Sequence, residues 1–163
     1  MFKNSEKAPK SYTPLEALPK IAAFCAYQER TQKEVEEKLK SYGLDEDEAG
    51  EIIIRLSREK LLDEERYAQA YARGKHRTNG WGRRRIKMEM KAKGLSEYCI
   101  KSGLKELDGD EYYDKLKLLL EQRDAREKES HPQKRKMKLM AYLTQKGYES
   151  DLIQEAIGEL QAG

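Results

Sequence analysis

Residues 61–95 read LLDEERYAQAYARGKHRTNGWGRRRIKMEMKAKGL and contain two helical segments with a break between them. The first segment opens with the acids Asp63, Glu64 and Glu65, which are favoured at the positive end of a helix dipole. The break falls at 79–82 (NGWG), because a glycine on each side of the tryptophan lets the backbone turn sharply. The second segment is strongly basic and ends at Gly94, a typical helix terminator. We therefore predict two consecutive helices here.

Positive charge is concentrated in this stretch. Residues 73–93 hold nine Lys or Arg against one acid, a net charge of +8, whereas the whole chain carries +3. A local surface of this kind suits a polyanion or an acidic protein partner. We call the following residues the basic face and predict that they bind such a partner: Arg73, Lys75, Arg77, Trp81, Arg83, Arg84, Arg85, Lys87, Lys91 and Lys93.

Composition favours an elongated shape with a thin core. Charged residues make up 39% of the 163 residues and hydrophobic ones only 37%, whereas globular chains have about 25% charged residues. The start lacks the apolar core of a signal peptide, and the sequence has no run of about 18 apolar residues. We expect a flexible tail at 1–12, a cytoplasmic location, and buried free thiols at Cys25 and Cys99.

Helical spacing runs through the whole chain and strand patterns are nearly absent. Counted from Gly43, Gly94 and Gly147, the offsets −8, −4, +1, +6, +10 and +13 carry apolar, small or aromatic residues every time. The three sets are Val35, Leu39, Leu44, Ala49, Ile53 and Leu56; Ile86, Met90, Leu95, Ile100, Leu104 and Leu107; and Leu139, Leu143, Tyr148, Ile153, Ile157 and Leu160. We predict an all-α, elongated array of three tandem three-helix repeats at 13–60, 61–108 and 109–163, each opened by a further helix at about 15–28, 64–77 and 110–128.

A second basic region lies at 123–138, where Lys and Arg again outnumber the acids. We predict a helix break at Ser130, His131 and Pro132 within it. Its secondary binding residues are predicted to be Arg126, Lys134, Arg135 and Lys138.

No catalytic arrangement is visible in the sequence. The two histidines, His76 and His131, stand in polar, basic surroundings without a Cys or paired acids at ligand spacing, so we expect both at the surface. The GWG turn at 80–82 lacks the lysine and the preceding strand of a phosphate-binding loop. We predict no enzymatic activity, no cofactor and no metal.

Two side chains, Trp81 and Arg85, allow two interpretations. Trp81 could pack over the start of the following helix, or stand exposed beside the arginines as a binding or base-stacking residue. Arg85 could belong to a binding face or pair with an acid of the helix at 64–77. Tyr67, with Tyr71, is expected to form core between the first two helices of the second repeat.

Four short motifs are spread over the first two repeats: TxxEVxxKL at 31–39, LLDEERYAxAY at 61–71, GWGxxRI at 80–86 and KGL at 93–95. In this order they closely resemble the RecX family of bacterial regulators of the RecA recombinase, and the resemblance covers about residues 15–160. One departure is Arg83, where family members often carry proline as the first helical residue. Another is Met90, where leucine is common.

The resemblance implies a monomeric, all-helical repeat protein that lodges along the groove of the RecA–DNA filament. Such a protein modulates, most often inhibits, strand exchange, ATP hydrolysis and repressor cleavage, and so acts on DNA recombination, DNA repair and the SOS response. It also implies weak DNA binding. The residues alone leave two alternatives open: a helical-repeat protein that acts on DNA rather than on RecA, and a scaffold whose charge serves solubility.

Overall fold

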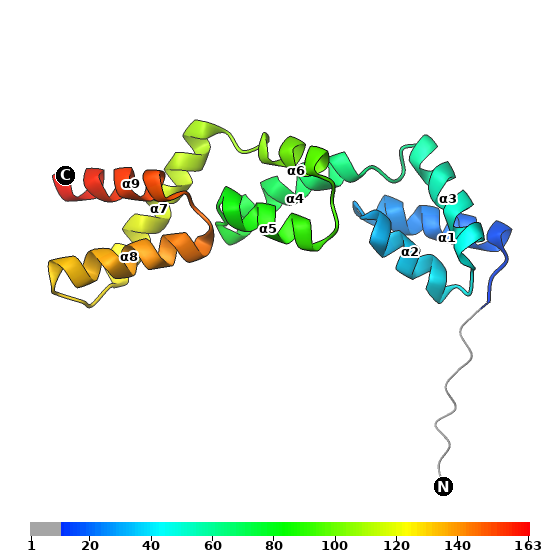
Figure 1. Ribbon diagram of the computed structural model, residues 1–163, viewed down its shortest axis with the longest axis horizontal. Helices are drawn as coiled ribbons and strands as arrows, with labels where there is room; N and C mark the ends of the chain where they lie inside the picture. The colour runs from blue at the N-terminus through cyan, green and yellow to red at the C-terminus, as the bar shows by residue number, and fades with distance from the viewer. Residues whose placement is uncertain (1–10) are drawn as a thin grey trace, which may run out of the picture. The chain divides into compact units, whose positions relative to one another are not determined.

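A computed structural model describes residues 11–163, and all of their regular structure is helical (Figure 1). The helices are α1 (Pro14–Tyr27), α2 (Gln32–Ser41), α3 (Glu46–Arg58), α4 (Glu64–Asn79), α5 (Arg83–Ala92), α6 (Glu97–Leu104), α7 (Gly109–Arg126), α8 (Pro132–Lys146) and α9 (Ser150–Ala162). The predicted all-α class of three-helix repeats is confirmed, and so is the helix break before Pro132. Within these residues no helix is both long and apolar enough to cross a bilayer. The tail predicted at 1–12 lies outside the described residues except for its last two.

Two compact units make up the chain, Met1–Tyr67 and Ala68–Gly163. The first contains α1–α3 and the start of α4, and the second contains the remainder of α4 and α5–α9. Most of the second repeat and the whole of the third therefore share one unit. The residue boundaries of the repeats stay a prediction.

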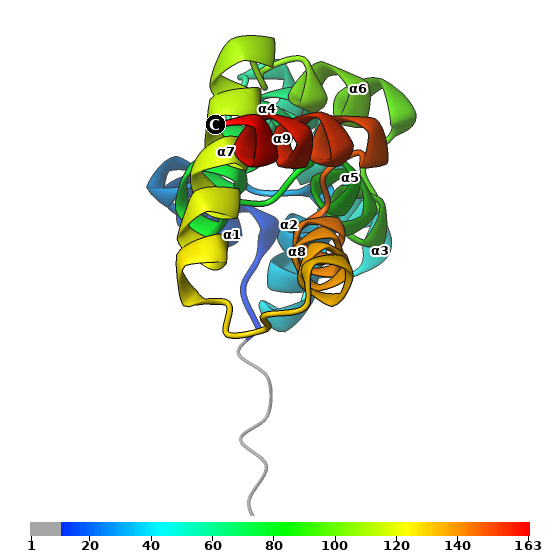
Figure 2. The same cartoon turned by 90° about the vertical axis from the view of Figure 1, so that its left-hand side faces the viewer.

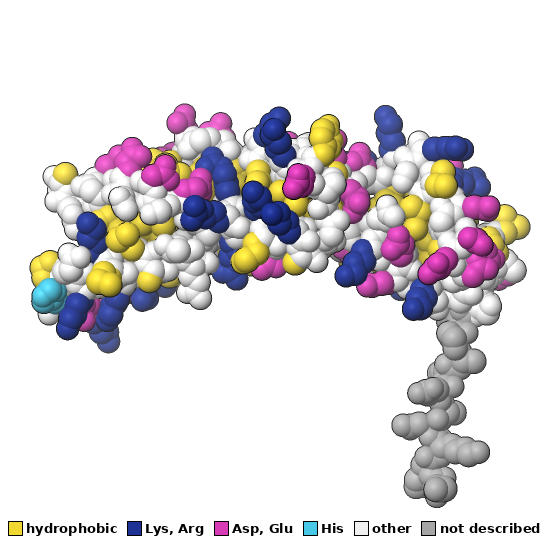
Figure 3. All heavy atoms as spheres, in the orientation of Figure 1, with side chains coloured by type: hydrophobic (Ala, Val, Ile, Leu, Met, Phe, Trp, Pro, Cys, Tyr) yellow, Lys and Arg dark blue, Asp and Glu magenta, His cyan; other side chains and the backbone are white. Residues whose placement is uncertain are grey.

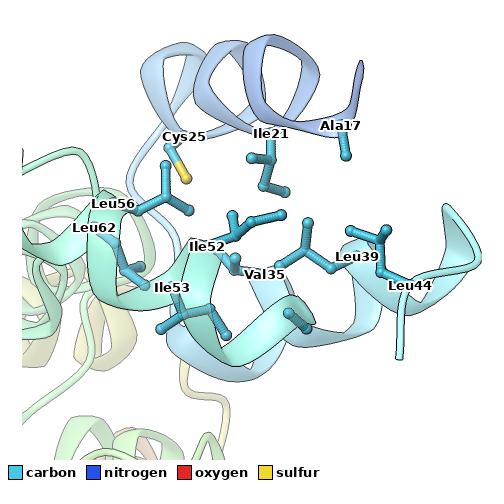
Figure 4. Close-up of a cluster of buried hydrophobic side chains, with 11 residues drawn as sticks. Ala17, Ile21, Cys25, Val35, Leu39, Leu44, Ile52, Ile53, Leu56 and Leu62 are labelled. Carbon is cyan, nitrogen blue, oxygen red and sulfur yellow. The ribbon is translucent and has the colours of Figure 1, made fainter. Parts of the chain in front are cut away.

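The first unit closes around one apolar cluster (Figure 4). Ile21 of α1, Leu39 of α2 and Leu56 of α3 are almost fully buried within it, because each sits on its helix's apolar stripe. Asp45 starts α3 with a capping box, in which its carboxylate accepts the Glu48 N–H at 2.8 Å while the Glu48 side chain accepts the Asp45 N–H at 3.1 Å. Helix ends that are satisfied in this way let a short three-helix unit keep its shape.

The second unit holds the other two helix triplets. In the first of these, α5 packs on α6, and α4 approaches α6 where a Cβ on Gly103 would come within 2.7 Å of the Ala68 carbonyl oxygen. In the second triplet, α7, α8 and α9 pack on one another, as the view toward this end of the chain shows (Figure 2).

The apolar positions predicted from the three glycines are buried, except that Leu104 and Leu160 are half-buried. Tyr67 is buried, and this burial raises the pKa of its hydroxyl to about 12. Cys25 is a buried free thiol as expected, and burial raises its pKa. The prediction for Cys99 was wrong: its free thiol is half-buried, because it lies one position away from the buried Ile100 and so off the apolar stripe of α6.

The second and third repeats meet at a backbone-to-backbone contact. Gly82 N–H donates to the Lys146 carbonyl at 2.8 Å, and Arg84 N–H donates to the Gly147 carbonyl at 3.0 Å. A Cβ on Gly82 would overlap the backbone of Gly147, and one on Gly147 would overlap Arg85. Gly147 also has φ +101°, the left-handed conformation that ends α8. Both positions therefore need glycine for space, and Gly147 needs it for conformation as well.

This contact predicts opposite effects for two Gly→Ala substitutions. Gly82→Ala forces the repeats apart and should lower the free energy of unfolding by about 2–3 kcal/mol. Gly74→Ala, in α4 of the same unit, has open space around it and should raise stability by up to about 1 kcal/mol, because alanine favours helix. Urea denaturation measures both, and equal stability of the two variants would contradict the close contact.

Candidate functional site

The outer face of α5 carries cations that form no ion pair with another described residue. Ile86 and Met90 point into the core, which leaves Arg84, Lys87 and Lys91 exposed on the opposite side. Their spacing of three and four residues places them on one helix face. Among residues 11–163 none of the three forms an ion pair. Their full charge is therefore presented to solvent.

Arg83, the first residue of α5, is engaged inside the molecule instead. Its Nη1 lies 2.7 Å from Glu149 Oε2, and its guanidinium carbon lies 3.7 Å from the centre of the Tyr112 ring. The Tyr112 hydroxyl accepts the Arg83 N–H at 3.0 Å and donates to the same Glu149 carboxylate. Burial, followed by the bond to Glu149, raises the Tyr112 pKa above its usual range, so this hydroxyl stays protonated. Arg83 thus links the two repeats, and its charge is paired with Glu149.

Trp81, at the turn before α5, has two cations close to its ring. The Lys75 ammonium is 5.1 Å from its ring centre and the Arg85 guanidinium 4.3 Å. Arg85 also donates to the Gln145 carbonyl at 3.5 Å, and the tryptophan is half-buried. The structure therefore combines the two interpretations of Trp81, which packs at the helix start and keeps part of its ring exposed. Arg85 pairs with no acid among the described residues.

The remaining members of the basic face are less uniform. Arg73 forms an ion pair with Glu106 at 3.2 Å, and the Lys93 ammonium lies 5.4 Å from the Tyr71 ring centre. Arg77 is exposed near the end of α4. Among the cations of the basic face, Arg77, Arg84, Lys87 and Lys91 have neither an ion pair nor a ring contact within residues 11–163.

The acids of the secondary region neutralise part of its positive charge. Arg135 is 2.8 Å from Asp124, and it also donates to the Glu127 and Glu129 carbonyls at 2.9 Å. Lys138 lies 3.4 Å from Glu129 and 3.8 Å from Glu127. Arg126 and Lys134 remain exposed, with no ion pair to any residue of 11–163. Arg135 and Lys138 therefore stabilise the α7–α8 loop, whereas Arg126 and Lys134 are open to solvent.

The expectation that His76 lies at the surface was wrong. His76 is only 8% exposed, its Nδ1 lies 2.9 Å from the Trp81 carbonyl, and its ring stacks on Tyr112 at 5.2 Å. Its sequence neighbours are polar, but α7 covers it from a distant part of the chain. His131 is exposed as expected, and its Nδ1 accepts the Lys134 N–H at the start of α8.

No group of three or more His, Cys, Asp or Glu suited to a metal occurs within the described part of the chain. Two further cations border α5 that counting charge along the sequence did not include: Lys101 and Lys105, both exposed on α6 and at its end. They lie seven and eleven residues after Gly94, so the repeat pattern could have identified them. In the space-filling view, Lys and Arg side chains gather with hydrophobic atoms over the segment labelled α5 and α6 in Figure 1 (Figure 3).

Three tandem three-helix domains, the second of which carries a basic, outward-facing helix, define an all-α repeat protein. Sequence models of the first, second and third three-helix domains of RecX match residues 21–56, 63–104 and 110–157 in that order. The chain belongs to the RecX family.

Individual relatives agree with this assignment. The chain is 32% identical over 138 residues to the regulatory protein RecX of Oceanobacillus iheyensis, covering 84% of this chain and 50% of that protein. It is 30% identical to that of Halalkalibacterium halodurans, with 84% and 52% covered. The crystal structure of RecX from Lactobacillus salivarius is similar with a TM-score of 0.85 and 28% identity, covering 92% of this chain and 97% of the other. The chain spans about half the length of the curated relatives it matches.

Burial of His76 predicts a dependence of stability on pH. Burial lowers its pKa from the ordinary 6.5, and the charges of Lys115 and Arg83 act in the same direction, while the Trp81 carbonyl and Glu111 oppose them. The unfolded chain therefore binds the proton more readily, so this contribution is complete above pH 6.5 and is lost as pH falls toward the lowered folded value.

His76→Asn retains an N–H donor for the Trp81 carbonyl but cannot titrate. Between about pH 7.5 and 5.5 the free energy of unfolding of the wild type should fall more than that of His76→Asn, by at most about 1.4 kcal/mol per pH unit for one proton. His131→Asn keeps a helix cap at an exposed site and should retain the wild-type slope. Parallel pH profiles for the wild type and His76→Asn would contradict the buried state.

Proposed function

We propose that the protein binds the RecA–DNA filament and inhibits its recombinase, ATPase and coprotease activities, without catalysing a reaction itself. Membership of the RecX family, through three domains matched in order, carries this proposal. Because the RecA–DNA filament forms in the bacterial cytoplasm, we place the protein there. The residues at the described surface supply charge and contact area, which is what a regulator that acts by occupying a filament requires.

The exposed cations of α5 support an electrostatic mode of binding. Arg84, Lys87 and Lys91 have no internal partner among the described residues, so a partner's acidic groups or DNA phosphates can approach them directly. Such charges speed association and fix orientation, and their effect weakens as salt is added. Several domains on one chain add contacts without each needing high affinity. Inhibition then follows from occupancy of the filament.

The repeat pattern supplies a matched test of this mode. Arg84 and Lys91 lie ten and three residues before Gly94, and Lys33 and Lys40 lie ten and three residues before Gly43. Arg84→Glu with Lys91→Glu should weaken inhibition of RecA-catalysed ATP hydrolysis on single-stranded DNA roughly 10- to 100-fold, at about 1 kcal/mol or more per reversed charge. The effect should shrink at high salt.

Lys33→Glu with Lys40→Glu reverses the same number of charges at the same repeat positions and should inhibit like the wild type. All three proteins should first show equal thermal stability. If both double variants inhibited equally, α5 would be ruled out as the binding element. If the wild type did not inhibit, the proposed function would be ruled out.

A further inference from the structure

A hollow of about 600 Å³ opens between α5 and α6 in the second unit. Ile100, Leu104 and Leu107 contribute its apolar lining, and of these Leu104 is the most exposed. Two helices with their side chains form the walls, so the hollow is a groove on a rigid part of the fold. No other segment of the described chain fills this groove.

Lysines line both walls of this groove. Lys87 and Lys91 come from α5, and Lys101 and Lys105 from α6 and its end. Each pair is four residues apart, about 6 Å along a helix, and like charges at this spacing destabilise a helix slightly. None of the four forms an ion pair with another described residue, and one acid, Glu97, lies among them. Four lysines against one acid leave the groove with a net positive charge, which a negatively charged partner would neutralise.

The first unit contains the same groove with different charges. Between α2 and α3, a hollow of about 1160 Å³ is lined by residues at every offset from Gly43 that the second groove occupies from Gly94, except that of Leu107. Glu36 stands where Lys87 does, Gly50 where Lys101 does, and Ile54 where Lys105 does. The three-helix fold therefore creates the groove, and the sequence of the second repeat makes it basic.

We propose that the α5–α6 groove docks an acidic amphipathic helix of a protein partner. Where that partner is RecA, this inference rests on the proposed function. Acids on both flanks of such a helix would meet the two lysine pairs, and its apolar seam would cover Leu104. The lining contains no aromatic ring on which a base could stack, and phosphates would leave the aliphatic floor uncovered. These features favour a protein helix over a nucleic acid.

A synthetic peptide tests the groove without RecA. The probe is a fluorescein-labelled helix of about 18 residues with leucine at i, i+3, i+4 and i+7 and glutamate on both flanks, measured by fluorescence anisotropy. We expect saturable binding that is at least tenfold weaker for Lys101→Gln with Lys105→Gln. Lys33→Gln with Lys40→Gln, which removes two lysines from the equivalent groove of the first repeat, should bind like the wild type. A peptide with glutamine in place of glutamate should not bind.

Photocrosslinking then locates the partner. A benzoylphenylalanine at Lys105, on RecA filaments assembled on single-stranded DNA, should crosslink to an acidic helical segment of RecA. The same residue at Ile54, the matched position of the first repeat, should not crosslink to that segment. Peptide binding that is absent, or unaffected by the Lys101 and Lys105 changes, overturns the groove proposal, and so do crosslinks to DNA alone. If the peptide binds as expected but the wild type leaves RecA filaments unchanged, the proposed function fails and the groove proposal stands.

Discussion

The backbones of Gly82 and Gly147 lie so close together that neither residue can carry a side chain. Two hydrogen bonds, from Gly82 to Lys146 and from Arg84 to Gly147, fix this approach. Since Gly82 immediately precedes α5, the contact sets where that helix begins and how it is rotated. Ile86 and Met90 consequently enter the core, whereas Arg84, Lys87 and Lys91 face outward. The position of the outward-facing cations on α5 thus follows from a constraint on two glycines.

The same junction divides the arginines of the GWGRRR turn among three tasks. Arg83 is held by Glu149 and Tyr112, and Arg85 covers Trp81, whereas Arg84 remains exposed. Consecutive residues on a helix point in directions about 100° apart, so neighbours with the same side chain can have different roles. Net charge counted along the sequence overstates the surface available to a partner, because internal ion pairs neutralise part of it.

Periodicity was sufficient to predict the helices, the tandem repeats and most of the core, because one helix face must be apolar wherever it packs. Leu104 fits the pattern but is only half-buried, because it lines the α5–α6 groove. The bond between Arg83 and Glu149 could not be predicted, since the two residues are 66 positions apart. His76 was placed at the surface for the same reason: its polar sequence neighbours gave no sign that Tyr112 would cover it. Lys101 and Lys105 were accessible to prediction through the repeat offsets but lie outside the stretch with the highest charge.

The proposed regulation depends on whether this basic surface serves a protein filament or DNA alone. The most direct measurement compares the affinity of the wild-type protein for RecA filaments preassembled on single-stranded DNA with its affinity for the same DNA without RecA, at physiological salt. Our account predicts clearly tighter binding to the filament. Equal or tighter binding to the naked DNA would contradict it and would make nucleic-acid binding the primary activity.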